Sequence, residues 1–263
     1  MHTVNNHGVF MHTPVLSVRR AATALVCAAA MVSLAACNSG DTDAVGSAGG
    51  STPSKTAEAS PAAEPNGIEK LSAKEIYDMG HKANAGAGSF REQMTRGDAK
   101  TDLLLSATEC VGSVKMSKGS FEIIRKGNDV WAKPDSTLVK GFNSELGTKL
   151  SASTWLHGTP SHPLMKGFAS WCHEEQFTKP DTLDAGNKAT KGKVATVDGQ
   201  QAVPVVMTAK GESVTWYVAT TGKPYLFKED STRDDMPDVV YSDFGKPVGA
   251  QAPSGSVEEA PKE

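Results

Sequence analysis

Cys37 is the residue best placed to do chemistry, because it ends the run Leu-Ala-Ala-Cys. Two arginines at 19 and 20 precede residues 21–34, a mostly apolar stretch with the length of a signal-peptide core and too short to span a bilayer as a helix. This layout is typical of a bacterial lipoprotein signal, in which the thiol receives a diacylglyceryl group. The alternative is an ordinary secretory signal with an incidental cysteine. We expect residues 1–36 to be a signal peptide and Cys37 to carry the lipid.

The predicted anchor has consequences for location. Each buried methylene contributes about 0.8 kcal/mol, so the two chains of a diacylglyceryl group hold a protein stably at a membrane. We therefore expect the mature protein on the outer face of the cytoplasmic membrane, exposed to the cell envelope. The membrane is then a partner through Cys37, and any protein partner is unknown.

Two cysteines remain beyond Cys37, namely Cys110 and Cys172, 62 residues apart. Outside the cytoplasm such a pair most often forms a disulfide. Free thiols and a metal site are the alternatives, since Cys172 precedes His173, but a single Cys-His dipeptide lacks the spacing of a zinc site.

Other chemistry-bearing residues give weaker signals. His157 and His162 flank a Gly-Thr-Pro turn, and solvated loop histidines are favoured over a metal site. The acidic residues of 229–238 favour a hairpin turn, because a calcium loop needs tighter alternate spacing. The sequence contains no Gly-x-Ser-x-Gly elbow and no phosphate loop. We expect no catalytic residues, no metal and no cofactor, hence not an enzyme.

The elements that would position these residues begin with a helix after Ser72. Ser72 and Glu75 form a capping-box pattern, and Leu71 and Ile76 a hydrophobic staple. The predicted apolar face comprises Ile76, Met79 and Ala83, and the helix ends at 86–88.

Strand-like segments separated by glycine-containing turns follow this helix. A second helix is predicted from Pro163, with Leu164, Phe168 and Trp171 at helical spacing. It carries Cys172, so the disulfide would join it to a strand ending at Cys110. The predicted strands are 89–96, 102–110, 111–116, 121–125, 129–133, 193–197, 202–209, 213–220, 225–231 and 239–244.

This order predicts an α+β fold with a single large curled antiparallel sheet, a half-barrel of about nine or ten strands, and helices over its concave face. Such a sheet encloses a space. Its candidate lining consists of large apolar side chains, each of which could equally belong to a filled core. These candidates are Leu104, Phe121, Trp131, Trp155, Phe168, Trp171 and Trp216.

The domain organisation follows from composition. Residues 37–67 are rich in small and polar side chains and predict a flexible tether, 68–253 the folded domain and 254–263 a disordered acidic tail. Without the two signal arginines, 25 basic residues oppose 30 acidic ones. No dense Lys/Arg stripe exists to neutralise phosphates, so we expect no nucleic-acid partner.

Several short segments resemble a family of actinobacterial lipoproteins, the LppX/LprG family, within the broader LolA-like fold. The resemblance extends over about residues 70–253 and implies a half-barrel whose helices cover an apolar cavity that binds lipids or lipidated molecules. The segments that carry it are 110–114, 130–135, the helix with Trp171-Cys172, 191–199, 216–225 and 242–248.

Three functions compete at this stage. The first is a carrier that buries acyl chains between sheet and helices. The second is a structural or signalling module with a filled core that acts through a protein partner. The third and weakest is a hydrolase with an unrecognised site. A cavity of a few hundred Å³ lined by apolar side chains distinguishes the first from the second.

Overall fold

A computed structural model describes residues 64–173, 175–178, 189–209 and 211–261, which belong to one compact unit, Glu58–Glu263. The predicted signal peptide, Cys37 and most of the predicted tether lie outside the described residues. The described residues include a few before the predicted boundary at 68. Pro65 bridges to Thr221, and the Asn66 side chain donates to the carbonyl oxygens of Ala219 and Gly222.

The described helices are short. They are η1 (Ile68–Lys70), α1 (Ala73–Ala85), α2 (Ser136–Leu146), α3 (Pro163–Ala169), η2 (Ser170–Cys172) and α4 (Glu175–Thr178). None of the helices in this described part is long and apolar enough to cross a membrane.

The predicted capping box of α1 is confirmed. The Ser72 hydroxyl accepts from the Glu75 amide, and the Glu75 carboxylate accepts from the Ser72 amide at 2.9 Å. The predicted apolar face was wrong in part, since Met79 is 40% exposed whereas Tyr77 and His81 are buried with Ile76. The helix turns a different face to the sheet from the predicted one, because the ring of Tyr77 packs against Trp216 of the sheet, with centroids 4.7 Å apart.

One sheet of 13 strands forms the body of the unit in the described residues. In spatial order it runs β13-β6-β5-β4-β3-β2-β1-β12-β11-β10-β9-β7, with β8 also paired to β9, and all pairs except β13–β6 are antiparallel. The strands are β1 (Ser89–Arg96), β2 (Ala99–Ser106), β3 (Glu109–Met116), β4 (Gly119–Lys126), β5 (Asp129–Pro134), β6 (Trp155–Gly158), β7 (Ala189–Lys191), β8 (Ala195–Val197), β9 (Gln200–Ala209), β10 (Glu212–Ala219), β11 (Leu226–Ser231), β12 (Asp238–Ser242) and β13 (Val257–Glu259).

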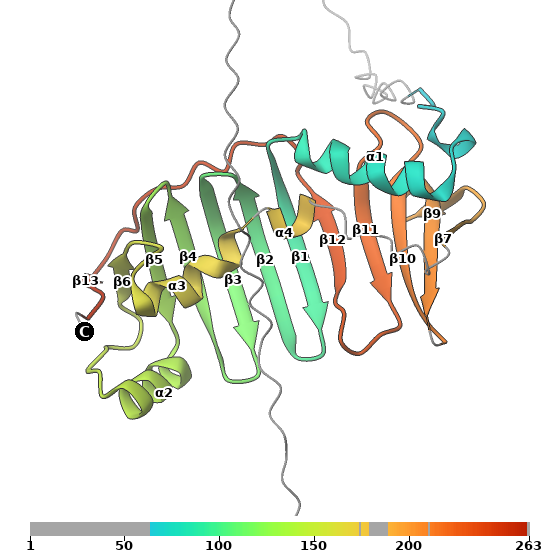
Figure 1. The fold of residues 1–263 in the computed structure, drawn as a ribbon. Helices are drawn as coiled ribbons and strands as arrows, with labels where there is room; N and C mark the ends of the chain where they lie inside the picture. Colours follow the sequence, from blue (N-terminus) through green and yellow to red (C-terminus); the bar gives the residue numbers. More distant parts are fainter. Residues whose placement is uncertain (1–63, 174, 179–188, 210, 262–263) are drawn as a thin grey trace, which may run out of the picture. The chain divides into compact units, whose positions relative to one another are not determined.

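The predicted fold class is confirmed as a large, open, curled and mainly antiparallel sheet with few helices (Figure 1). α1, α3 and α4 lie over one face of the sheet, and α2 lies at the ends of β4 and β5. The covered face is the apolar one. A single register row across it joins Phe121, Val114, Thr101, Met94, Val239, Glu229 and Trp216.

Three sequence predictions are corrected here. The predicted disordered tail is wrong for the residues of it that the structure describes, 254–261, because Val257–Glu259 form β13 and Ala260 is buried. The hydrogen bond from the Ala260 amide to the His157 carbonyl oxygen, 2.8 Å, continues that pairing. Cys110 lies near the start of β3 rather than at the end of the preceding strand, because the chain turns at 107–108. The sheet also has more strands than predicted, since β6, β7 and β13 are only three or four residues long.

Candidate functional site

Two adjoining apolar pockets lie beside α2 and α3, the first bounded also by the β3–β4 turn and the second by Pro261, and we call them together the α2–α3 groove. The first has a volume of about 410 Å³ and the second about 490 Å³, and they share Phe142 and Leu164. The first is lined by Met116, Ser117, Lys118, Phe121, Leu138, Phe142, Leu164, Gly167, Phe168 and Trp171. The second is lined by Phe142, Leu146, Thr148, His162, Pro163, Leu164 and Pro261.

α2 supplies one wall of the groove through Leu138, Phe142 and Leu146, which are spaced four residues apart and therefore share a helix face. Asp135 caps this helix by accepting from the amides of Thr137 and Leu138, both at 2.9 Å. The same carboxylate accepts from the amide and the hydroxyl of Ser120 at 2.7 and 2.9 Å, which fastens the start of α2 to β4.

Several hydrogen bonds converge on Asp135 and change its acidity. Partial burial by itself would raise the pKa of this carboxyl group. The bonds from the Leu138 amide, the Ser120 hydroxyl and amide, and the Thr137 amide outweigh burial and lower the pKa. Asp135 is therefore ionised at neutral pH and is a weak base.

α3 supplies the opposite wall and is held by aromatic packing and by the disulfide. Phe168 meets Phe121 of β4 edge to face with centroids 4.9 Å apart, and Phe142 of α2 at 5.8 Å. Three residues beyond the end of α3, Cys172 is bonded to Cys110 of β3. The structure thus contains the predicted disulfide, which ties the end of this helical segment to the sheet.

The seven predicted cavity residues separate into three groups. Phe121, Phe168 and Trp171 come together in the groove. Trp216 packs against Tyr77 in the filled interior under α1. The third group points to the face of the sheet away from the helices and consists of Leu104, Trp131 and Trp155.

The predicted cavity between the sheet and its helices does not extend beneath α1. Ile76 and Tyr77 are fully buried there against Trp216, Val218 and Leu226. The pocket space lies instead beside α2. Sequence reasoning missed Leu138, Phe142 and Leu146, although an Asp followed by apolar residues at positions 3, 7 and 11 is a usable helix signal.

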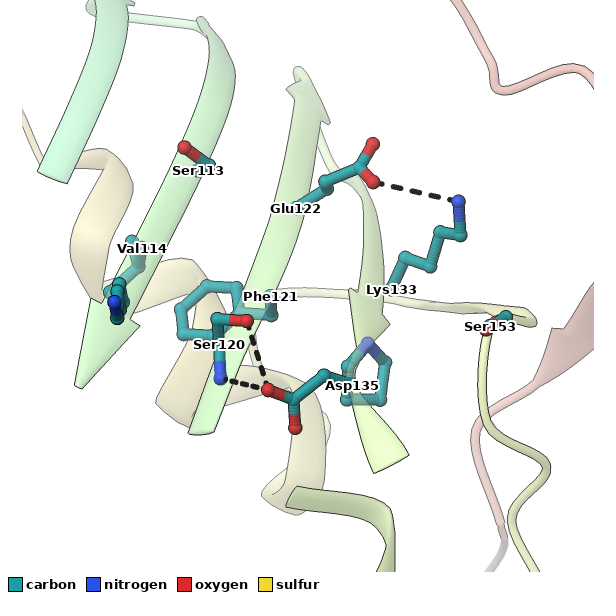
Figure 2. Close-up of a pocket in the computed structure, with 10 residues that line it drawn as sticks. Ser113, Val114, Ser120, Phe121, Glu122, Lys133, Asp135 and Ser153 are labelled. Carbon is teal, nitrogen blue, oxygen red and sulfur yellow. Dashed lines mark hydrogen bonds and ion pairs between the residues drawn. The ribbon is translucent and has the colours of Figure 1, made fainter. Parts of the chain in front are cut away.

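A polar pocket of about 420 Å³ lies on the uncovered side of β3, β4 and β5 (Figure 2). In this pocket Lys133 Nζ lies 3.5 Å from Glu122 Oε1, and the Asp135 carboxylate accepts a hydrogen bond from the Ser120 hydroxyl. Its lining contains no histidine or cysteine. The group that accepts from the Ser120 hydroxyl is the weakly basic Asp135, which is a poor general base for nucleophilic catalysis.

His157 and His162 do not form a shared metal site. His157 Nδ1 lies 2.8 Å from Glu259 Oε1 and its Nε2 lies 3.0 Å from Asp129 Oδ1, while His162 Nε2 contacts the Pro261 carbonyl oxygen at 3.0 Å. In the described part of the chain, no group of three or more His, Cys, Asp or Glu residues is arranged to hold a metal ion.

The acidic stretch forms the predicted hairpin turn between β11 and β12. Asp238 accepts from the Ser231 amide at 2.8 Å, and the Arg233 guanidinium pairs with Asp235.

A buried carboxyl group lies in the core of the covered face. Glu92 of β1 is 0% exposed and its two carboxyl oxygens lie 2.7 and 2.9 Å from the Thr101 hydroxyl. Burial raises its pKa to about 7, the Thr101 bond opposes this, and the charges of Asp102 and Glu229 add to the rise. Because the group is enclosed, it bears on stability rather than on ligand chemistry.

Comparison with known proteins adds little detail to this geometry. The sequence matches no family model and no curated protein. Similar solved structures include a LolA superfamily protein from Nitrosomonas europaea, at 11% identity, 66% coverage of this chain, 92% of that chain and a TM-score of 0.24. They also include a DUF1329 family protein from Desulfovibrio piger, at 11% identity, 68% coverage of this chain, 95% of that chain and a TM-score of 0.24.

Proposed function

We propose that this chain is an extracytoplasmic membrane lipoprotein, anchored through Cys37, that binds the alkyl chain of a lipid or other hydrophobic ligand in the α2–α3 groove. The observation that carries the proposal is the apolar lining of the first pocket. Phe121, Phe142, Phe168 and Trp171 bring four aromatic rings to a space of about 410 Å³. This volume lies within the range of about 300–1,000 Å³ that is typical of small-molecule sites.

The energetics suit reversible binding. Each methylene removed from water contributes about 0.8 kcal/mol, so ten methylenes in the groove would contribute about 8 kcal/mol before the cost of immobilising the ligand. No bond is made or broken, so the site needs no catalytic groups. A lipid anchor would keep such a groove close to membrane lipids, which are the proposed source of ligand.

The filled interior under α1 favours a second candidate, a structural or signalling module that acts through a protein partner. Trp216, one of the predicted cavity residues, packs there against Tyr77 and both side chains are buried. The two candidates differ in one measurable property, because only the first requires the α2–α3 groove to take up a hydrophobic ligand.

Gly167 offers a direct test. It lines the groove, and a Cβ built on it meets nothing within 4 Å, so the side chain of Gly167→Leu starts in open space and extends at the wall of the groove. Gly141 of α2 also has open space around a built Cβ but lines neither pocket, so Gly141→Leu is a matched control. Each substitution should raise helix stability by about 0.5–1 kcal/mol.

The measurement is the fluorescence of cis-parinaric acid titrated with the full chain in amphipol. We expect binding in the micromolar range, at least about tenfold weaker in Gly167→Leu and unchanged in Gly141→Leu. Absence of binding to the unmodified chain, or equal binding by both variants, would overturn the proposed function and leave the partner-binding module as the better account.

A further inference from the structure

We propose that the ligand of the α2–α3 groove is an anionic single-chain amphiphile of the fatty-acid class, whose charged end lies at Lys118. This inference rests on the proposed function and narrows it to one class of ligand.

The ionisable side chains that line the groove indicate an anionic ligand. Across both pockets, Lys118 and His162 are the residues with ionisable side chains, and neither lining contains an Asp or a Glu. The chain as a whole has 30 acidic against 27 basic residues, so a groove without carboxylates departs from its average surface. Such a lining is complementary to an anion. The nearby carboxylate of Asp135 lines neither pocket and accepts hydrogen bonds from Ser120, Thr137 and Leu138.

The placement of Lys118 carries the second step. Lys118 is exposed in the β3–β4 turn and lines the first pocket together with Ser117. The following residue, Gly119, has φ 132°, and a Cβ there would lie 2.7 Å from Leu138 Cγ and 2.8 Å from Asp135 Oδ1. The turn is therefore packed closely against the start of α2, which fixes the backbone of the exposed Lys118 beside the pocket.

The size of the pocket carries the third step. The pocket that Lys118 lines has a volume of about 410 Å³, near the lower end of the range of small-molecule sites, so the space next to the charged end suits one alkyl chain better than two. A fatty acid has both a negative charge and a single alkyl chain. Its chain would lie along Phe142 and Leu164, and its carboxylate would meet Lys118 at the solvent boundary. An ion pair at such an exposed position is worth only a small factor in affinity.

The test is displacement of cis-parinaric acid from the full chain in amphipol by three amphiphiles with the same chain length. Palmitate should displace the probe at about fivefold lower concentration than hexadecanol and about tenfold lower than hexadecyltrimethylammonium. Lys118→Gln should abolish this order. Lys126→Gln, a change at an exposed lysine that lines neither pocket, should preserve it.

The outcomes separate the two proposals. If the three amphiphiles displace the probe equally, or if Lys118→Gln keeps the preference for palmitate, the assignment of an anionic ligand is overturned while the hydrophobic groove stands. If a two-chain anionic phospholipid displaces the probe better than palmitate, the single-chain class is overturned. If the probe does not bind at all, both this inference and the proposed function fail.

Discussion

His157 of β6 joins Glu259 of β13 to Asp129 of β5, with its two ring nitrogens 2.8 and 3.0 Å from the two carboxylates. Both partners accept hydrogen bonds, so both ring nitrogens must donate, and only the imidazolium form does this. The ring also stacks on Trp131 with centroids 5.1 Å apart. A single protonated side chain thus fastens the C-terminal strand to the edge of the sheet.

The first prediction concerns the pH dependence of this contact. The hydrogen bond that His157 donates to the Glu259 carboxylate raises the pKa of His157, burial opposes the rise, and the contact with Asp129 adds to it. Because the folded value is raised, the stabilisation is fully present below the ordinary histidine value of about 6.5 and is lost as pH rises through the folded pKa. We expect the protection of the Ala260 amide against hydrogen exchange, corrected for intrinsic rate, to fall across this window.

Glu259→Gln supplies the control for that prediction. Glu259 contributes most to the raised pKa of His157, and this substitution removes its carboxylate. The fall in protection of the Ala260 amide with rising pH should therefore become smaller in this variant. An identical fall in the variant would show that His157 does not hold β13.

A second prediction concerns Glu92. Its pKa is raised from 4.5 to about 7, so its proton stabilises the fold at low pH and that stabilisation is lost as pH rises from about 4.5 to about 7. The shift corresponds to about 3 kcal/mol. Glu92→Gln keeps an oxygen to accept from the Thr101 hydroxyl, so it should raise the free energy of unfolding at about pH 8 and leave it nearly unchanged at about pH 4. Equal effects at both pH values in chemical denaturation would contradict this account.

The features of the fold that could be predicted from the sequence are those whose interacting residues are close together in the chain. Ser72 and Glu75 lie three residues apart and act within one helical turn, so the capping box was correctly predicted. Met79 was wrongly predicted to be on the buried face of α1, because that face is determined by the contact of Tyr77 with Trp216, which is far away in the sequence. β13 was missed for the same reason, since its three residues are stabilised by pairing with Trp155–His157 and not by any pattern of their own.

The site was predicted only in part. Phe121, Phe168 and Trp171 were among the predicted cavity residues and do meet in the groove. The other wall comes from α2, which is interrupted in sequence by Gly141 and begins with an Asp135 cap that also depends on Ser120. Leu104 lies in an unbroken run of leucines, and such a run does not show which face each side chain takes.

A third prediction concerns the disulfide. Cys110 and Cys172 are 62 residues apart, and the chain-entropy model assigns about 4 kcal/mol to such a closure. The double variant Cys110→Ala, Cys172→Ala should lower the free energy of unfolding by about that amount. It should also weaken binding of cis-parinaric acid, because η2 continues directly from α3 and carries Trp171. An unchanged denaturation midpoint would show that the bond adds nothing to the fold.

A fourth prediction concerns the anchor. Cys37→Ala should release the chain from the membrane fraction and abolish incorporation of radiolabelled palmitate, since the proposed two-chain attachment is lost. Cys27→Ala is the matched control, because Cys27 lies within the apolar stretch of the predicted signal and should leave labelling intact. Labelling that persists in Cys37→Ala would contradict the lipoprotein assignment.

The most direct test of the central claim is photo-crosslinking of the full chain with a diazirine-bearing palmitate analogue, followed by peptide mass spectrometry. The account predicts adducts on α2 and α3, around Phe142, Leu164 and Trp171, that unlabelled palmitate competes away and Gly167→Leu suppresses. Adducts confined to the polar face around Glu122 and Lys133, or no competed adduct anywhere, would contradict the claim that the α2–α3 groove binds an alkyl chain.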